Sequence, residues 1–168
     1  MASAIRILSP DDAPAYLALR LRALREHPEA FATSESEESR RSAAELARRL
    51  QPGPEQVTVG AFENEHLLGF AALVRGNRAR QRHRARLAGM YVAPESRGRG
   101  QGRALVERVL VLARQWRVSD VALAVTVGNG AARALYASIG FVSYGVESRG
   151  LRVDTRYYDV ELMNLRIS

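Results

Sequence analysis

Apolar residues recur at helical spacing in two segments near the N-terminus. The first helix is predicted over residues 9–27, where a Ser-Pro pair begins it, apolar positions follow every three or four residues, and a His-Pro pair ends it. A Ser-x-x-Glu capping box at residues 42–45 begins a shorter helix that ends before Pro52. An acidic segment, residues 34–39, separates the two helices.

From residue 56 onward the pattern becomes one of short apolar strands that alternate with amphipathic helices. Strands are predicted over residues 57–59, 67–74, 87–92 and 121–127, helices over 102–116 and 132–139, and a closing strand pair over 141–146 and 155–163. The strand at 121–127 is almost continuously apolar, as expected where both faces are covered. With no repeat and no long linker, this order predicts one α/β domain over residues 1–168, built around a mixed sheet.

Composition is consistent with that class and excludes several others. The chain has 168 residues, of which 46% are hydrophobic and 26% are charged, as in ordinary globular domains. It has no cysteine, which excludes a disulfide framework, a thiolate metal site and a cysteine nucleophile. Its longest aliphatic runs, such as residues 109–113, are too short to span a bilayer, and no secretory signal pattern begins the chain. We therefore expect a cytoplasmic protein.

The net charge of +7 is concentrated in one basic segment, residues 75–86. Alternate arginines would lie on one strand face if the strand at 87–92 extends back through them: Arg78, Arg80, Arg82, Arg84 and Arg86. Such a stripe would attract a polyanion, so a basic nucleic-acid-binding module is an alternative function. Against this function, the segment has no aromatic residue for base stacking and no nucleic-acid-binding motif accompanies it. A solvated arginine-rich hairpin is the simpler interpretation.

The turn at residues 97–102 is the most informative segment. It has three glycines in five residues and lies between a predicted strand and a predicted helix, where unpaired backbone amides point outward and attract anions. A Walker loop is excluded because Gly102 is followed by Arg103-Ala104 instead of Lys-Ser/Thr. The dinucleotide fingerprint fails in both registers, because its third glycine would fall on Arg103 or Leu105.

Two motifs in this half of the chain match one known family. Residues 97–102 fill the pattern Arg/Gln-x-x-Gly-x-Gly/Ala after a GMYVAP strand, and residues 129–141 fill Asn-x-x-Ala-x-x-Leu-Tyr-x-x-x-Gly-Phe. The chain therefore resembles the GNAT superfamily of N-acetyltransferases, well over residues 87–141 and loosely elsewhere. The resemblance implies acetyl-CoA as cosubstrate and a single-domain fold with a mixed, strongly bent central sheet flanked by helices on both faces.

The resemblance also implies roles for individual residues in binding acetyl-CoA. Three backbone positions of the strand before the turn would pair with the pantetheine arm: Met90, Tyr91 and Val92. The turn itself would hold the diphosphate through Arg97, Gly98, Arg99, Gly100, Gln101 and Gly102. Asn129 would lie near the reactive end of the cofactor, in a slot that opens where the strands ending at Val92 and Val127 splay apart.

In this family an amine attacks the thioester carbonyl directly, and no covalent enzyme intermediate is needed. Tyr136 matches the usual general acid for the departing thiolate, since a phenol of pKa about 10 is protonated at neutral pH. Backbone amides of the strand before the turn would stabilise the oxyanion. The alternative for Tyr136 is a packing role beside Leu135 and Ile139.

One position departs from the family pattern. Some members carry a glutamate as general base five residues before the conserved asparagine, where this chain has Ala124. The proton would then leave through another residue, through water, or before the amine binds. The resemblance implies that the first two helices border the acceptor pocket, so Glu35, Glu37 and Glu38 are candidates for this base and for binding a cationic acceptor. The alternative for them is a solvated acidic loop. His83 is another candidate base, although in a basic run it is expected on an exposed strand face.

The expected function is therefore acetyl transfer to a primary amine, either on a small molecule or on a peptide N-terminus or lysine. A non-catalytic acyl-CoA sensor and a nucleic-acid-binding module are the alternatives. An enzyme releases CoA thiol, a sensor is stabilised by acetyl-CoA without turnover, and a nucleic-acid module binds with steep salt dependence. The resemblance also makes a homodimer formed through the C-terminal strands conceivable.

Overall fold

Seven strands form one mixed sheet in the computed structural model, which describes residues 3–168. In spatial order they are β1 (Ser3–Ile7), β2 (Gln56–Glu63), β3 (His66–Arg75), β4 (Arg84–Val92), β5 (Asp120–Thr126), β7 (Arg156–Arg166) and β6 (Val142–Val153). All neighbours are antiparallel except β4 and β5, which are parallel. The helices are α1 (Ala13–Glu26), α2 (Glu35–Ser39), α3 (Ala43–Leu50), α4 (Gln101–Gln115) and α5 (Gly130–Ile139).

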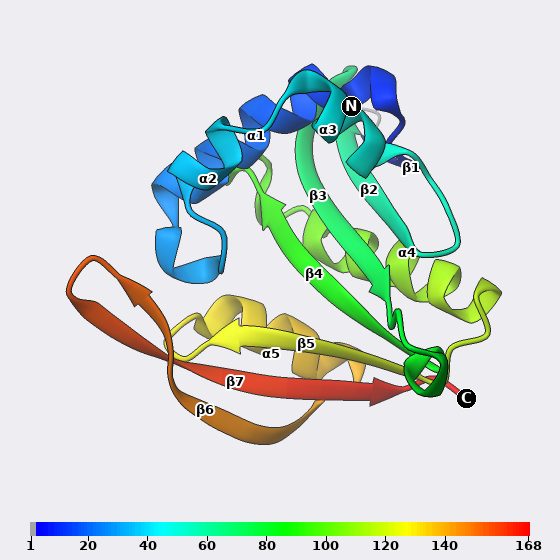
Figure 1. Cartoon of the computed structure of the whole chain (residues 1–168), viewed down its shortest axis with the longest axis vertical. Coiled ribbons are helices and arrows are strands. Elements are labelled where there is room, and N and C mark those ends of the chain that lie inside the picture. The colour runs from blue at the N-terminus through cyan, green and yellow to red at the C-terminus, as the bar shows by residue number, and fades with distance from the viewer. Residues whose placement is uncertain (1–2) are drawn as a thin grey trace.

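The helices cover both faces of the sheet, so the predicted fold class is confirmed. Figure 1 shows α1, α2 and α3 on one side and α4 and α5 on the other. Two separate buried clusters result, one beneath α1 and α3 around Leu46 and Phe70, and one beneath α4 around Leu105 and Val121. Apolar burial on both faces is the dominant stabilising contribution in such a layered domain.

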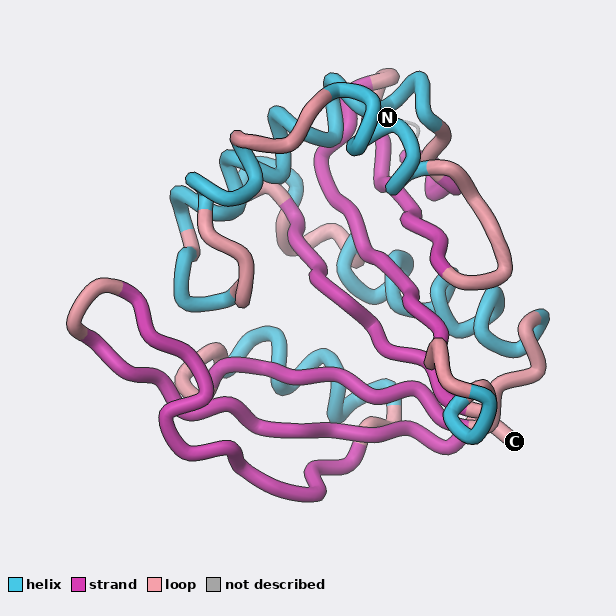
Figure 2. Tube along the Cα trace, in the orientation of Figure 1, coloured by secondary structure: helices cyan, strands magenta, loops and turns pink. Residues whose placement is uncertain are grey.

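The central feature of the sheet is that β4 and β5 separate along their length. They pair only at residues 84–86 with 120–122, and the two halves of the sheet then diverge (Figures 1 and 2). A bulge explains the bend, because two residues of β4, Ala88 and Gly89, oppose only Ala72 of β3. Gly89 has φ +85°, a conformation that glycine adopts without a steric cost. The strongly bent sheet expected from the sequence is thus present.

Several strands are longer than predicted, β6 most of all, which extends to Val153 instead of ending at residue 146. Apart from such bounds, the structure differs from the sequence prediction at three places. The strand β1 was not predicted, since a five-residue edge strand carries little periodic signal and is defined by its pairing with β2. The stripe of alternating arginines does not form, because β4 begins only at Arg84 and residues 79–81 form a 3-10 turn. The acidic segment is the short helix α2, whose Ser34 caps it, and not a loop.

Candidate active site

The turn between β4 and α4 presents backbone amides to solvent. Gly98 and Gly100 have φ +75° and +79°, and a side chain at either would meet no other atom within 4 Å. Ala104 donates the first helical bond of α4, to the Gly100 carbonyl, so the amides of residues 101–103 have no helical acceptor. An open, positively polarised helix N-terminus of this kind fits a diphosphate.

A buried carboxylate, Glu63 at the end of β2, fixes the shape of this turn. It accepts hydrogen bonds from the Ser96 hydroxyl at 2.7 Å and the Gln101 amide at 3.2 Å, and Arg99 pairs with it at 3.0 Å. These bonds, the one from Ser96 foremost, lower the pKa of Glu63. The Gln101 and Arg99 side chains therefore hold the turn in place, and sequence analysis did not single out Glu63 because its partners are distant in sequence.

Replacing this carboxylate tests its role. We expect Glu63→Gln to raise the KM for acetyl-CoA several-fold, because the turn loses its anchor.

The pH dependence of stability is a second test of Glu63. A carboxylate with a lowered pKa stabilises the fold above its unfolded pKa of about 4.5 and loses that contribution as the pH falls through the folded value. Thermal unfolding of Glu63→Gln should thus depend less on pH below 4.5 than that of the wild type, whereas the exposed control Glu65→Gln should leave both properties unchanged. A wild-type KM in Glu63→Gln would contradict this anchoring role.

The other arginines near the turn are also engaged. Arg97 donates from Nε to the Val92 carbonyl at 2.8 Å, and its guanidinium lies over the ring of Tyr91. Arg103 donates to Ser138 at 2.6 Å. Since these side chains already have partners within the domain, the backbone amides are the main groups the turn offers to an anion.

Beyond the bulge, β4 exposes one backbone edge. On one side, β3 pairs with Met90, Tyr91 and Val92. On the other side, the pairing of β4 with β5 ends at Arg86, so among the described residues no strand pairs with β4 beyond that point. An extended ligand can add to such an edge as a strand. The Tyr91 side chain turns away and donates to Glu26. The Tyr91 backbone faces β3, because the Ala93 amide donates to the Leu68 carbonyl and alternate residues of a strand bond to the same neighbour. The open edge is therefore offered by the backbone of Met90 and Val92, and not by that of Tyr91.

Tyr136 extends from α5 toward this edge of β4. Its ring is buried, packs edge-on against Phe141 at 5.9 Å, and its hydroxyl donates to the Met90 sulfur at 3.9 Å. Burial raises the pKa of Tyr136 to about 12. A thioether is a weak acceptor, so a better acceptor arriving beside Met90 can take this proton or hydrogen bond.

Asn129 lies at the start of α5, near the same opening. Its side-chain oxygen accepts from the Ala132 amide at 3.3 Å, which makes it the N-cap of the helix. Gly102 lies opposite on α4, and a Cβ there would approach Leu135 to 3.1 Å. The glycine therefore permits α4 and α5 to pack closely behind the turn.

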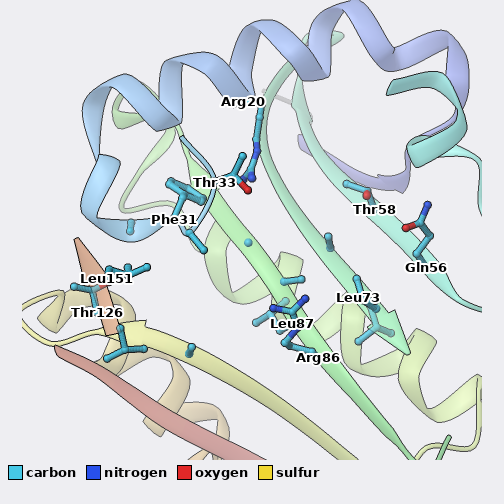
Figure 3. A pocket seen from close by; sticks show the side chains of 18 of the residues that line it. Arg20, Phe31, Thr33, Gln56, Thr58, Leu73, Arg86, Leu87, Thr126 and Leu151 are labelled. Atoms are coloured by element: carbon cyan, nitrogen blue, oxygen red, sulfur yellow. The ribbon is translucent and has the colours of Figure 1, made fainter. Parts of the chain in front are cut away.

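A cavity of about 430 Å³ opens on the face of the sheet that α1 covers, between the half formed by β1 to β4 and the half formed by β5, β7 and β6 (Figure 3). Residues from α1, from the segment 30–33 and from both halves of the sheet line it. Thr126 of β5 donates to the Glu29 carbonyl at 2.6 Å and so links β5 to the segment that follows α1. The cavity includes Ala88 and Gly89 at the bulge, so a molecule inside it reaches β4 where the strands separate.

The three glutamates expected to contact the acceptor do not line this cavity. Glu35 pairs with Arg25, and Glu37 forms the capping box of its own helix with Ser34. Glu38 is fully buried and accepts from Arg49 at 2.8 Å. Their carboxylates are already satisfied by the protein, and His83 does not line the cavity either.

A different acidic residue lines the cavity, Glu147 on β6, which is exposed to solvent. Thr126, Val160 and Glu147 are directly opposed across β5, β7 and β6, and directly opposed residues share a face. Ala124 lies on the same wall, so the position where some GNAT members have a glutamate faces the cavity here as a methyl group. Among the described residues, Glu147 is the one carboxylate of this lining.

Comparisons with known proteins agree with this geometry. The model of the acetyltransferase (GNAT) family matches residues 19–141. A Mycobacterium tuberculosis (strain H37Rv) protein described as an uncharacterized N-acetyltransferase is 30% identical over 107 residues, which are 64% of this chain and 65% of that protein. The chain thus spans just under two thirds of the length of that curated relative.

Two solved structures show the same fold. A GNAT-family acetyltransferase from Streptococcus pneumoniae has a TM-score of 0.88 and 25% identity, covering 99% of this chain and 100% of its own. A GNAT superfamily phosphinothricin acetyltransferase from Sinorhizobium meliloti, solved in complex with acetyl-CoA, has a TM-score of 0.84 and 22% identity, covering 99% of this chain and 89% of its own.

The bent mixed sheet with helices on both faces is thus the fold of the acetyltransferases found in these comparisons. The chain belongs to the acetyltransferase (GNAT) family, whose cosubstrate is acetyl-CoA. Within residues 3–168, no helix combines the length and the hydropathy needed to cross a membrane.

Proposed function

We propose that the protein is an N-acetyltransferase that transfers the acetyl group of acetyl-CoA to a primary amine by direct attack in a ternary complex. One arrangement carries this proposal: the open edge of β4 runs from the amides of the turn at 97–102 to the phenol of Tyr136 and the bulge at Gly89. Each end of this path has the chemistry that the corresponding end of acetyl-CoA requires.

Binding would use main-chain groups almost throughout. The amides at the start of α4 hold the diphosphate, and the β4 edge at Met90 and Val92 pairs with the amides of the pantetheine arm. Asn129 borders the reactive end. When bound, acetyl-CoA supplies the thioester carbonyl, and a β4 amide near the bulge donates to the oxygen on which negative charge develops.

Chemistry then requires two proton transfers. The amine nitrogen forms a bond to the carbonyl carbon and loses a proton, the carbon–sulfur bond breaks, and Tyr136 gives its proton to the departing thiolate. The raised pKa of Tyr136 keeps it protonated until that step. Glu147 takes up the proton of the amine, either directly or through a water, in place of the carboxylate that Ala124 lacks.

The role of Glu147 leads to a sharp expectation. Glu147→Gln should lower kcat/KM for the amine about 10²-fold, the lower range for general base catalysis, and leave the affinity for acetyl-CoA unchanged. The matched control is Glu45→Gln, which removes the same negative charge on the exposed face of α3 and should retain wild-type activity. Wild-type rates for Glu147→Gln at every pH tested would remove this carboxylate from the reaction.

Release of CoA thiol tests the proposed function as a whole. The protein is incubated with acetyl-CoA and a broad panel of amines, thiol is detected continuously, and the acetylated product is identified by mass spectrometry. We expect turnover with at least one amine and thermal stabilisation by acetyl-CoA. Stabilisation without turnover on any amine would favour the sensor, and salt-sensitive binding of nucleic acid without CoA binding would favour the nucleic-acid module.

A further inference from the structure

Arg20 on α1 is a buried guanidinium without a partner. It is only 8% exposed, and its Nε is buried without a hydrogen bond. No hydrogen bond or ion pair of its guanidinium is found among residues 3–168, where its Cζ lies over the rings of Phe31 and Phe70, at 4.9 Å and 5.8 Å from their centroids. A charge taken out of water and left unpaired is costly, so such groups usually have a counter-ion.

Other buried charges of this domain do have partners, which makes Arg20 unusual. Glu38, which is fully buried, pairs with Arg49 at 2.8 Å and with Arg41 at 3.4 Å. Glu63 is satisfied by three donors. The protein supplies partners for its structural charges, so the partner that Arg20 lacks is expected from outside the chain.

The Arg20 side chain is directed into the cavity of about 430 Å³ described above, where the proposed function places the amine acceptor. It lines that cavity, and Figure 3 shows it descending from α1 toward β4. Its terminal nitrogen would lie 3.4 Å from a Cβ on Gly89, so the guanidinium rests against the bulge where β4 leaves β5. An anion bound there would lie close to the position of the attacking amine.

The other charges of the cavity favour an anion as well. Arg86 lines the opposite part of the wall and has no ion pair within the described chain. Arg49 also lines the cavity, but Glu38 neutralises it. Against Arg20 and Arg86 stands one carboxylate, Glu147. An acceptor that carries only a positive charge would meet a net positive cavity, which disfavours its binding.

We propose that the acceptor is a small amine that also carries an anionic group, a carboxylate or phosphonate a few bonds from its nitrogen, and that Arg20 binds this group. A planar guanidinium held between aromatic rings is suited to bidentate binding of such an anion. A cavity of about 430 Å³ is within the range of small-molecule sites, which favours a free small molecule over a peptide. This inference rests on the proposed acetyl transfer.

Matched acceptors test the inference on the wild-type protein. The kcat/KM of the common L-α-amino acids is compared with that of their α-carboxamides, and aminoalkylphosphonates are compared with alkylamines of the same length. We expect the anionic member to be preferred about tenfold to hundredfold, as charged hydrogen bonds contribute. Equal rates within every pair, or a peptide N-terminus preferred over all free amino acids, would overturn the inference.

Substitution then assigns the preference to Arg20. Arg20→Gln should raise the KM for the anionic acceptor and leave the carboxamide unaffected, so that the preference disappears. Arg20→Lys should keep part of it, since a lysine retains the charge but not the forked donors. Arg25→Gln removes an exposed charge on the same helix and should retain the full preference. Unchanged acetyl-CoA binding by Arg20→Gln shows that the variant is folded, and an intact preference in that variant would contradict the assignment.

A measurement without turnover separates this inference from the proposed function. Acids that lack the amine, such as 4-methylpentanoate and alkylphosphonates, should raise the melting temperature of the wild type but not of Arg20→Gln. Stabilisation of this kind with no acetylation of any amine would leave the anion site standing and remove the proposed function. Acetylation of amines without any such stabilisation, and without a preference for anionic acceptors, would remove the anion site and leave the function.

Discussion

Gly100→Glu is expected to abolish acetyl-CoA binding. Gly100 has φ +79° and caps the N-terminus of α4, where a side chain would project into open space over the amides. A glutamate would be strained there and would place a negative charge beside the site of the diphosphate. Loss of two charge-assisted hydrogen bonds corresponds to an affinity at least about 100-fold weaker.

Isothermal titration with acetyl-CoA measures this effect. The matched control is Gly53→Glu, which adds the same charge at a loop glycine that also has no neighbouring atom within 4 Å and no positive φ. The control should bind acetyl-CoA like the wild type, and circular dichroism should show that both variants are folded. If a folded Gly100→Glu bound acetyl-CoA with wild-type affinity, the turn would not be the diphosphate site.

Tyr136→Phe is expected to lower kcat without weakening acetyl-CoA binding. Phenylalanine keeps the buried ring and its edge-on contact with Phe141 but has no proton for the thiolate. Removal of a general acid lowers kcat about 10²- to 10⁴-fold. Tyr144→Phe, which removes an exposed phenol on β6, should retain full activity. Equal kcat for wild type and Tyr136→Phe would leave Tyr136 with a packing role only.

The pH dependence of kcat offers an independent test of the same residue. Because burial raises the pKa of Tyr136 to about 12, the phenol is protonated, and competent as an acid, at every pH below that value. Ionisation of Tyr136 becomes appreciable only about one pH unit below its pKa, near pH 11. The kcat profile should therefore show no decline assignable to Tyr136 up to about pH 10. A decline centred near pH 9 that Tyr136→Phe eliminates would show that its pKa is much lower than the structure indicates.

Local signals explain why much of the fold could be predicted. Each such signal depends only on residues a few positions away in the chain. Examples are the capping serine at 42, the spacing of the apolar positions in α1 and the glycine that ends α5. The strand β1 carries no such signal, because its pairing with residues 59–63 depends on chain more than fifty positions away. Hence the succession of strands and helices from residue 56 onward was predicted, whereas the first edge strand was not.

The acidic segment shows the limit of arguments from composition. The clustering of Glu35, Glu37 and Glu38 suggested a surface for a cationic acceptor, but their partners are Arg25, Ser34 and Arg49. Whether a carboxylate is free or already paired depends on residues brought near it by folding. The cationic side of the cavity, Arg20 above all, has no sequence signature, since an arginine in an amphipathic helix is ordinarily exposed.

By itself the sequence determined the turn at 97–102 and the helix α5 with its tyrosine, because backbone conformation and capping depend on neighbouring residues. Only the tertiary structure decided what surrounds the acceptor. The bulge at Gly89 separates β4 from β5, and the space that results is lined by Arg20 from α1 and Glu147 from β6. Residues so far apart in the chain become neighbours through the burial of the two apolar layers, which acts over the whole fold and leaves no local pattern.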